Sequence, residues 1–163
     1  AFEARDRDLQ ATLTRRDAPT FQNDCLEFFF RPKDQPEIYY NFEINALGTI
    51  YDAANREGVR WARAAAWNSI GIVAAVHLDG TLNDSSDTDS GWSLELAIPW
   101  KDLDLLNRKS PRSGEQYLFH MARYDYAPHH SEGMELSSCA PLKKVKFHDD
   151  SDWLTLVFTG SPE

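Results

Sequence analysis

The stretch that decides the fold is Gly91-Trp92-Ser93-Leu94-Glu95-Leu96-Ala97-Ile98-Pro99-Trp100. Every second residue from Trp92 to Ile98 is large and apolar, so these side chains share one face of an extended strand and bury it against a core. Pro99 lacks a backbone N–H and therefore ends the strand. Its restricted φ suits the first position of a short helix, which we expect over 99–105.

The same alternation recurs on both sides of this stretch. It predicts the end of a strand in the first four residues, and short strands over 9–14, 25–31, 37–45, 49–53, 72–78, 116–126 and 153–159. Polar segments rich in turn-forming residues separate these strands, and we expect 127–152 to be a long irregular loop. Residues 60–69 fit either one or two helical turns or a loop. The pattern predicts an all-β fold, an antiparallel β-sandwich of the jelly-roll or immunoglobulin-like kind with one short helix.

Composition predicts a single globular domain over residues 1–163, with 42% hydrophobic residues. Because the chain opens at the end of a strand, we expect the first strands of the domain to precede Ala1. The net charge of −9 argues against a nucleic-acid partner, since phosphate binding needs clustered Lys and Arg. The longest apolar stretch, Ile70 to Leu78, is too short to span a bilayer, so we expect no membrane span.

Catalysis finds little support in the sequence. The patterns G-x-S-x-G and H-E-x-x-H and the phosphate-binding P-loop do not occur. Glu27 and Glu43 could sit across adjacent strands at a spacing that glycosidases use, but a sandwich of this size seldom provides the deep cleft they need. Cys25 and Cys139 fit either two buried thiols or a single disulfide, and neither has a base nearby in the sequence. We therefore expect that the protein is not an enzyme.

Three stretches resemble the family 9 carbohydrate-binding modules and the wider DOMON-like sandwiches. The first leads through Asp24, Glu27 and Phe29, similar to the family pattern D-x-x-E-x-F, and the second is G-W-x-x-E-x-x-I-P-W at 91–100. The third is the closing segment with Phe147-His148 and 154–156. The resemblance implies a sandwich that binds sugar or polysaccharide chains without catalysis. It also implies a secreted protein, extracellular or periplasmic, that is fused to or associated with a glycoside-acting catalytic domain.

The resemblance implies a site as well. Sugar sites of this family hold a pyranose ring between two tryptophans, while polar groups bind its hydroxyls. Phe21 stands at the first tryptophan position, Phe147 and His148 lie near the second, and Glu27 matches the hydroxyl-binding carboxylate.

The strand pattern extends this candidate site. If Leu26 and its alternate neighbours face the core, the opposite face exposes Glu27 together with Asn41 and Glu43, and aromatics mixed with acids and amides suit a sugar. Arg123, near the end of a strand, could reach the same cleft. The alternative is a face that packs under loops, with Glu27 paired to Arg31 and with Arg123 in a structural ion pair.

Two cofactors have candidate ligands. Asp84, Asp87 and Asp89 offer closely spaced oxygens for a structural calcium ion, which family 9 modules are known to hold; the alternative is an acidic turn that caps backbone amides. DOMON-like relatives that bind haem use axial His or Met ligands, and Met121 and Met134 are the only methionines. A haem- or redox-associated domain, or a structural sandwich that has lost sugar binding, are therefore the alternative functions.

Overall fold

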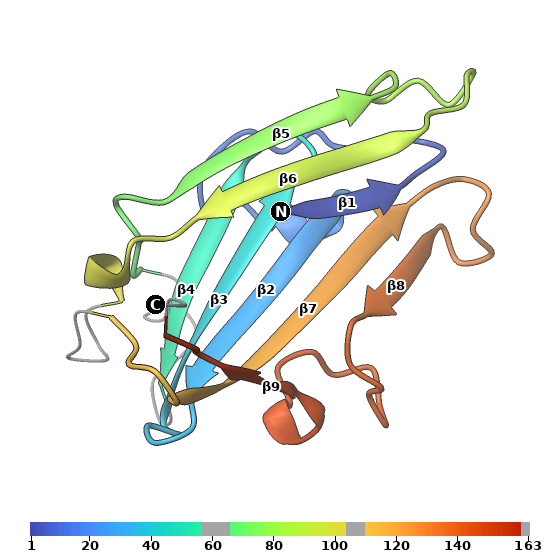
Figure 1. The fold of residues 1–163 in the computed structure, drawn as a ribbon. Helices are drawn as coiled ribbons and strands as arrows, with labels where there is room; N and C mark the ends of the chain where they lie inside the picture. The colour runs from blue at the N-terminus through green and yellow to red at the C-terminus, as the bar shows by residue number, and fades with distance from the viewer. Residues whose placement is uncertain (57–65, 104–109, 161–163) are drawn as a thin grey trace.

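The computed structural model describes residues 1–56, 66–103 and 110–160 (Figure 1). In these residues the chain forms two antiparallel sheets and short 3-10 turns, without an α-helix. The strands of the two sheets, in chain order, are β1 (Phe2–Arg5), β2 (Cys25–Pro32), β3 (Ile38–Asn45), β4 (Ile50–Arg56), β5 (Val73–Asp79), β6 (Gly91–Ala97), β7 (Gln116–Tyr126), β8 (Met134–Ser138) and β9 (Leu154–Val157). The prediction of an all-β antiparallel sandwich is confirmed.

The smaller sheet has the order β1-β6-β5, so the strand that decides the fold lies at its centre. Leu94 of β6 pairs with Phe2 on one side and with Val76 on the other. Gly91, opposite Arg5, has φ +144°, and a Cβ there would collide with the carbonyl oxygen of Ala4. Glycine at position 91 therefore lets β1 approach β6 closely enough to pair.

The larger sheet has the order β4-β3-β2-β7-β8, and β9 also pairs with β7. β7 is long enough for both partners, because β9 pairs with its first residues and β8 with its last. The smaller sheet crosses one face of the larger one, as Figure 1 shows. The main core fills the space between them and includes Leu26, Phe42 and Ile44 from the larger sheet and Trp92 and Leu94 from β6.

The strand expected at 9–14 does not form. The segment has no regular secondary structure, and side-chain acceptors take the place of a ladder. Asp89 accepts from the N–H of Leu9 (2.8 Å), Asn83 from that of Ala11 (2.9 Å), and Asn23 from the N–H groups of residues 12 and 13. The composition of the segment predicted a strand, whereas acceptors at positions 23, 83 and 89 bind its amides instead.

Other local expectations also change. Segment 127–152 contains the strand β8 and the 3-10 turn η4 (Asp150–Asp152), so it is more regular than expected. Of the helix expected at 99–105, the described part forms one 3-10 turn, η2 (Trp100–Asp102), and residues 104 and 105 lie outside the described residues. Most of 60–69 lies outside them too. Within the described residues, no helix is long and apolar enough to cross a bilayer.

The two cysteines follow neither of the expected arrangements. Both are free, and Cys25 is buried in β2 while Cys139 is exposed after β8.

Truncating Leu94 tests the central place of β6. Leu94 is fully buried in the main core, so Leu94→Ala should lower the free energy of unfolding by about 2–5 kcal/mol. Ile70→Ala is the control, because Ile70 is almost fully exposed and its truncation should change stability by less than about 0.5 kcal/mol. Urea denaturation measures both. Equal losses would contradict the assignment of β6 to the core.

Candidate functional site

Two glutamates face each other on the side of the larger sheet that points away from the main core. β2 and β3 pair so that Glu27 lies directly opposite Glu43. Directly opposed residues of an antiparallel pair have Cβ atoms about 5 Å apart, so two like charges here would repel. Both residues are nevertheless buried, with only 1% of Glu27 and 6% of Glu43 exposed.

Glu27 is held by three neighbours. Asn41 donates to its Oε1 (2.9 Å), and the Tyr124 hydroxyl donates to its Oε2 (3.1 Å). The His148 ring lies over the first of these oxygens, with Nε2 at 3.7 Å, and its Nδ1 is 2.9 Å from the Tyr39 hydroxyl. About half of the His148 side chain, 52%, is exposed, so this ring lies at the outer boundary of the site.

Glu43 is held from the 3-10 turn η1 (Thr20–Gln22). The Thr20 hydroxyl donates to Glu43 Oε2 (2.9 Å), and so does the backbone N–H of Phe21 (3.1 Å). The turn presents the Phe21 ring at the surface, 39% exposed, with its centroid 6.1 Å from that of Tyr124. The carboxyl of Glu43 thus fixes the position of an exposed aromatic ring.

Burial sets the protonation of the pair. It raises the pKa of Glu27 to about 8, with the charge of Glu43 adding to the effect, and it raises the pKa of Glu43 to about 7. Burial also lowers the pKa of His148, so this ring is a poor counter-charge. No Lys or Arg of the described residues forms an ion pair with either glutamate. At neutral pH we therefore expect at least one of the two carboxyls to be protonated.

The outer face of the sheet is covered, contrary to the expectation that it is exposed. Residues 139–153, which we call the cover segment, bring Phe147 and Trp153 into a second apolar cluster with Phe29. The rings of Phe29 and Trp153 are 5.0 Å apart. Arg31 pairs with Asp150 of this segment (2.7 Å) and not with Glu27. The covering of the face follows the alternative interpretation, although its expected ion pair does not form.

The structure joins most of the predicted site residues through Tyr124. Its hydroxyl binds Glu27, and its ring lies 6.1 Å from Phe21 and 5.6 Å from Phe147. The network includes Asn41, Glu43 and His148 through the contacts described above, while Phe147 is buried and presents no open surface. Tyr124 and Thr20 were missed by the sequence analysis. The alternation of β7 showed that Tyr124 shares a face with His120 and Ala122, but not which strand would lie beside it.

Arg123 is not part of this network. It lies on the opposite face of β7, directly across from Leu26, where its guanidinium pairs with Asp6 (2.9 Å) and Asp125 (2.7 Å). This is the structural ion pair that the sequence analysis considered as the alternative.

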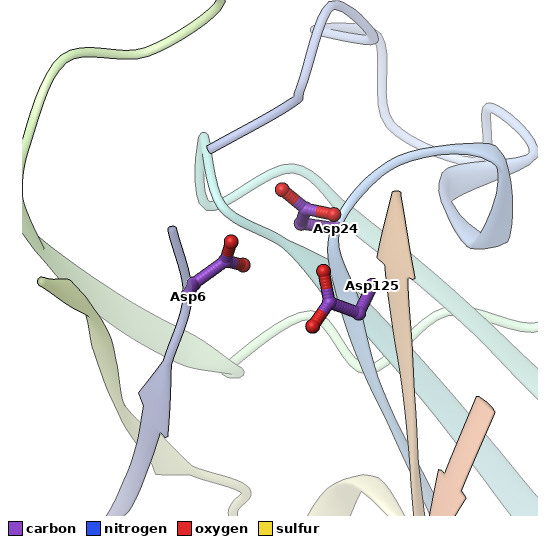
Figure 2. A group of neighbouring side chains, drawn as sticks. All are labelled: Asp6, Asp24 and Asp125. Carbon is purple, nitrogen blue, oxygen red and sulfur yellow. The ribbon is translucent and has the colours of Figure 1, made fainter. Parts of the chain in front are cut away.

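These two acids form a buried cluster with Asp24, and Figure 2 shows the three carboxylates turned toward one another. Asp6 follows β1, Asp24 precedes β2 and Asp125 lies in β7, and one oxygen of each lies within 4.8 Å of the others. The group could hold a metal ion. The described residues contain no other such group, so Asp84, Asp87 and Asp89 are not gathered in this way.

The three carboxylates of this cluster outnumber the one guanidinium that pairs with them. Arg123 is the cation that bridges Asp6 and Asp125, and Asp24 accepts N–H groups from Gln10 (2.5 Å) and Tyr126 (2.6 Å). Burial raises the pKa of Asp24 to about 8, and the charges of Asp6 and Asp125 contribute to this shift. In the loop at 83–91, by contrast, Asp84 accepts from Ser86 and Asp89 accepts backbone amides, as an acidic capping turn would.

Comparison with known proteins supports the family resemblance and the fold described above. The sequence profile of carbohydrate-binding family 9 matches residues 1–116. A crystal structure of a proposed carbohydrate-binding protein from Bacteroides uniformis ATCC 8492 superposes with a TM-score of 0.65 at 18% identity. The match covers 92% of this chain and 67% of that chain, and it supports the fold alone. No curated protein matches the sequence.

The buried glutamates should make stability depend on pH. Their folded-state pKa values, about 8 and about 7, lie above the ordinary value of 4.5, so the stability they contribute is complete below pH 4.5 and is lost as the pH rises through 7 and 8. The melting temperature should therefore fall between pH 5 and pH 9. Glu27→Gln should flatten this fall, by about 1.4 kcal/mol for each pKa unit removed.

Glu95→Gln is the matched control, because Glu95 is exposed in β6 and its replacement should leave the slope unchanged. Thermal melts of the three proteins across this pH range measure the effect. A wild-type slope in Glu27→Gln would contradict the raised pKa of Glu27 in the folded protein.

Proposed function

The chain belongs to carbohydrate-binding family 9, whose domains are non-catalytic binding modules, and we propose that this protein binds a sugar or a polysaccharide chain through the Glu27–Glu43 site. The observation that carries the proposal is the arrangement of two buried, hydrogen-bonded carboxyls between the exposed rings of Phe21 and His148.

Sugar chemistry suits this arrangement. A pyranose has an apolar C–H face and hydroxyls that both donate and accept, and an exposed aromatic ring such as Phe21 matches the first. The second needs planar polar groups in fixed positions. A protonated carboxyl can both donate and accept, and Asn41 and Tyr124 hold Glu27 in one orientation. Because these groups are desolvated already, a bound hydroxyl meets little competition from water.

Access to Glu27 runs past His148. Its ring is half exposed and touches the carboxyl at 3.7 Å, which is longer than a good hydrogen bond. We therefore expect a bound sugar hydroxyl to replace the His148 Nε2 contact, while Phe21 provides the stacking surface. In this proposal Phe21 takes the place of the first tryptophan of the family pattern, and His148, which with Phe147 lies near the second, takes part as the other exposed ring.

The geometry also supports a role in binding without catalysis. Both carboxyls are directed at protein donors, Glu27 at Asn41 and Tyr124, and Glu43 at Thr20 and the Phe21 amide. A glycosidase instead needs one carboxyl facing the glycosidic oxygen and the other facing the anomeric carbon. The hydrogen bonds of these carboxyls hold them and their neighbours in fixed positions, which suits ligand binding.

We propose that a structural calcium ion, if the protein holds one as its family implies, binds at Asp6, Asp24 and Asp125. Three carboxylates from three chain segments supply hard oxygen ligands, which calcium prefers. Oδ1 of Asp125 lies 3.2 Å from Nε2 of His130, although the two atoms do not form a hydrogen bond of good geometry. An ion there would join β1, the start of β2 and the end of β7.

The biological setting is proposed from the family. We propose that the protein acts outside the cytoplasm, as an extracellular or periplasmic module fused to or associated with a glycoside-acting catalytic domain. Cell fractionation and mass determination of the native protein test this, and a cytoplasmic protein of the mass of this chain alone would refute it.

Calorimetry against mono- and oligosaccharides of glucose, xylose, mannose and galactose tests the binding site. At least one sugar should bind, and Phe21→Ala and Glu27→Gln should each weaken its affinity about 10-fold or more. Val73→Ala is the control, because Val73 is exposed and lies in β5 of the smaller sheet, away from the residues of the network.

Three outcomes would contradict the proposal in different ways. Unchanged affinity in both site variants would move the site elsewhere while leaving the function intact. No binding to any sugar would leave a structural module. A Soret band that disappears on replacing Met121 or Met134 would instead establish the haem alternative.

Chelation tests the metal site. EDTA should lower the melting temperature by on the order of 5 °C, and added calcium should restore it. Asp24→Asn should abolish this response, whereas Asp87→Asn, at an exposed residue of the 83–91 loop, should keep it. The reverse pattern would place the ion at Asp84, Asp87 and Asp89, and no response in the wild type would remove calcium from the protein.

A further inference from the structure

A groove of about 380 Å³ lies beside the turn η1, at the end of the sandwich where β7 ends. Four parts of the chain line it: the segment 10–12, the end of η1 with the residue after it, the loop at 83–85, and the end of β7 with the residues that follow. Its volume falls within the range of about 300–1,000 Å³ that small-molecule sites occupy. The groove is therefore large enough to hold a ligand.

The lining of this groove is polar but uncharged. Amide and hydroxyl side chains supply its polar groups, from Gln10, Thr12, Gln22, Asn23, Asn83 and Ser85. The half-buried ring of Tyr126 adds an aromatic surface. A groove of similar volume, about 360 Å³, lies along β1, β6 and β5 and is lined by Glu3, Arg5 and Asp79. In a chain of which 26% is charged, a lining of amides and hydroxyls favours a neutral ligand rich in hydrogen-bonding groups.

Some of these polar groups hold the groove together, and others are available to a ligand. Asn83 accepts from the N–H of Ala11 (2.9 Å) and donates to its carbonyl (2.8 Å), and Asn23 accepts the N–H of Thr12. These bonds fix the segment 10–12 against the loop at 83–85. The side chains of Gln22 and Thr12 are exposed and form no hydrogen bond within the described part of the chain. They can therefore bind a ligand without breaking a contact of the fold.

The groove adjoins the Glu27–Glu43 site through η1 and β7. Phe21 and Gln22 are consecutive in η1, and the first belongs to that site while the second lines the groove. Tyr124 and Tyr126 lie two residues apart in β7, so they share a face and their Cα atoms are about 7 Å apart. The Phe21 ring lies 6.1 Å from that of Tyr124, and its carbonyl accepts from the Tyr126 hydroxyl (2.9 Å). One turn thus forms a border of both places, and a short oligosaccharide can span them.

Given the sugar site proposed above, on which this inference rests, we propose that the groove is a second subsite, which binds the next unit of a neutral oligosaccharide. Gln22 and Thr12 bind its hydroxyls, and the Tyr126 ring provides the apolar surface for its C–H face. The net charge of −9 and the lack of a cation among the described lining residues disfavour an acidic sugar. The protein then recognises a chain of at least two units, with one unit at Phe21 and Glu27 and the next in the groove.

Calorimetry with the mono-, di- and trisaccharides of glucose, xylose, mannose and galactose tests the second subsite. For the sugar that binds, the affinity of the wild type should rise about 10-fold or more from the monosaccharide to the trisaccharide. The double variant Gln22→Ala, Thr12→Val should lose most of this rise, and thermal melts should show that it is folded. Thr155→Val is the matched control and should keep the rise. Thr155 is exposed in β9, where it pairs with Leu118 in the first part of β7, whereas the groove lies at the other end of that strand.

Two further measurements separate this inference from the sugar site on which it rests. Phe21→Ala should weaken the binding of the monosaccharide and the trisaccharide alike. In NMR spectra of the wild type, the side-chain amide of Gln22 should shift with the trisaccharide more than with the monosaccharide.

The possible failures differ as well. Equal wild-type affinities for the monosaccharide and the trisaccharide would overturn the second subsite and leave the proposed function intact. A rise that persists in the double variant, without a shift of the Gln22 amide, would overturn the assignment of the subsite to this groove. If no sugar of any length binds, the proposed function and this inference fail together.

Discussion

Exclusion of water from the outer face of the larger sheet is the constraint on which the site depends. The cover segment places Phe147 and Trp153 on Phe29, and Glu27 and Glu43 lie buried on the same face. Without water, two opposed carboxylates can persist only by holding a proton or by accepting strong hydrogen bonds, and this pair does both. An open face would have left the glutamates charged, solvated and free to rotate.

Side-chain acceptors perform a second structural role at the end of the sandwich where the two sheets meet. Residues 9–13 have no strand partner, and Asp89, Asp24, Asn83 and Asn23 accept their backbone amides instead. Asp24 also accepts from the N–H of Tyr126, so one carboxylate joins the first loop to the end of β7. This use of acids explains why negative charge accumulates beside Asp6 and Asp125 in excess of the single guanidinium of Arg123, and why a cation would fit there.

Much of the fold was predictable because alternation is a local property. The strands β2, β3, β5, β6 and β7 lie within a few residues of their predicted positions, and the apolar faces of β5 and β6 do pack on the main core. The strand prediction failed at 9–14, where side chains accept the backbone amides that a neighbouring strand would have bound. It also failed at β8, a segment with weak alternation that forms a strand by pairing with β7. The helix after Pro99 was overestimated, because proline marks a start without specifying a length.

For the candidate site, the sequence by itself determined the residue types and which of them share a face. Glu27, Asn41 and Glu43 follow from the period of two, and Phe21 from the resemblance to family 9, in which it stands at the first tryptophan position. Only the tertiary structure decided that this face is covered, that Tyr124 connects its parts, and that Arg123 faces the Asp6 cluster instead. The physical reason is that burial, pairing and protonation depend on atoms brought together from strands far apart in the chain, whereas alternation depends only on neighbours along it.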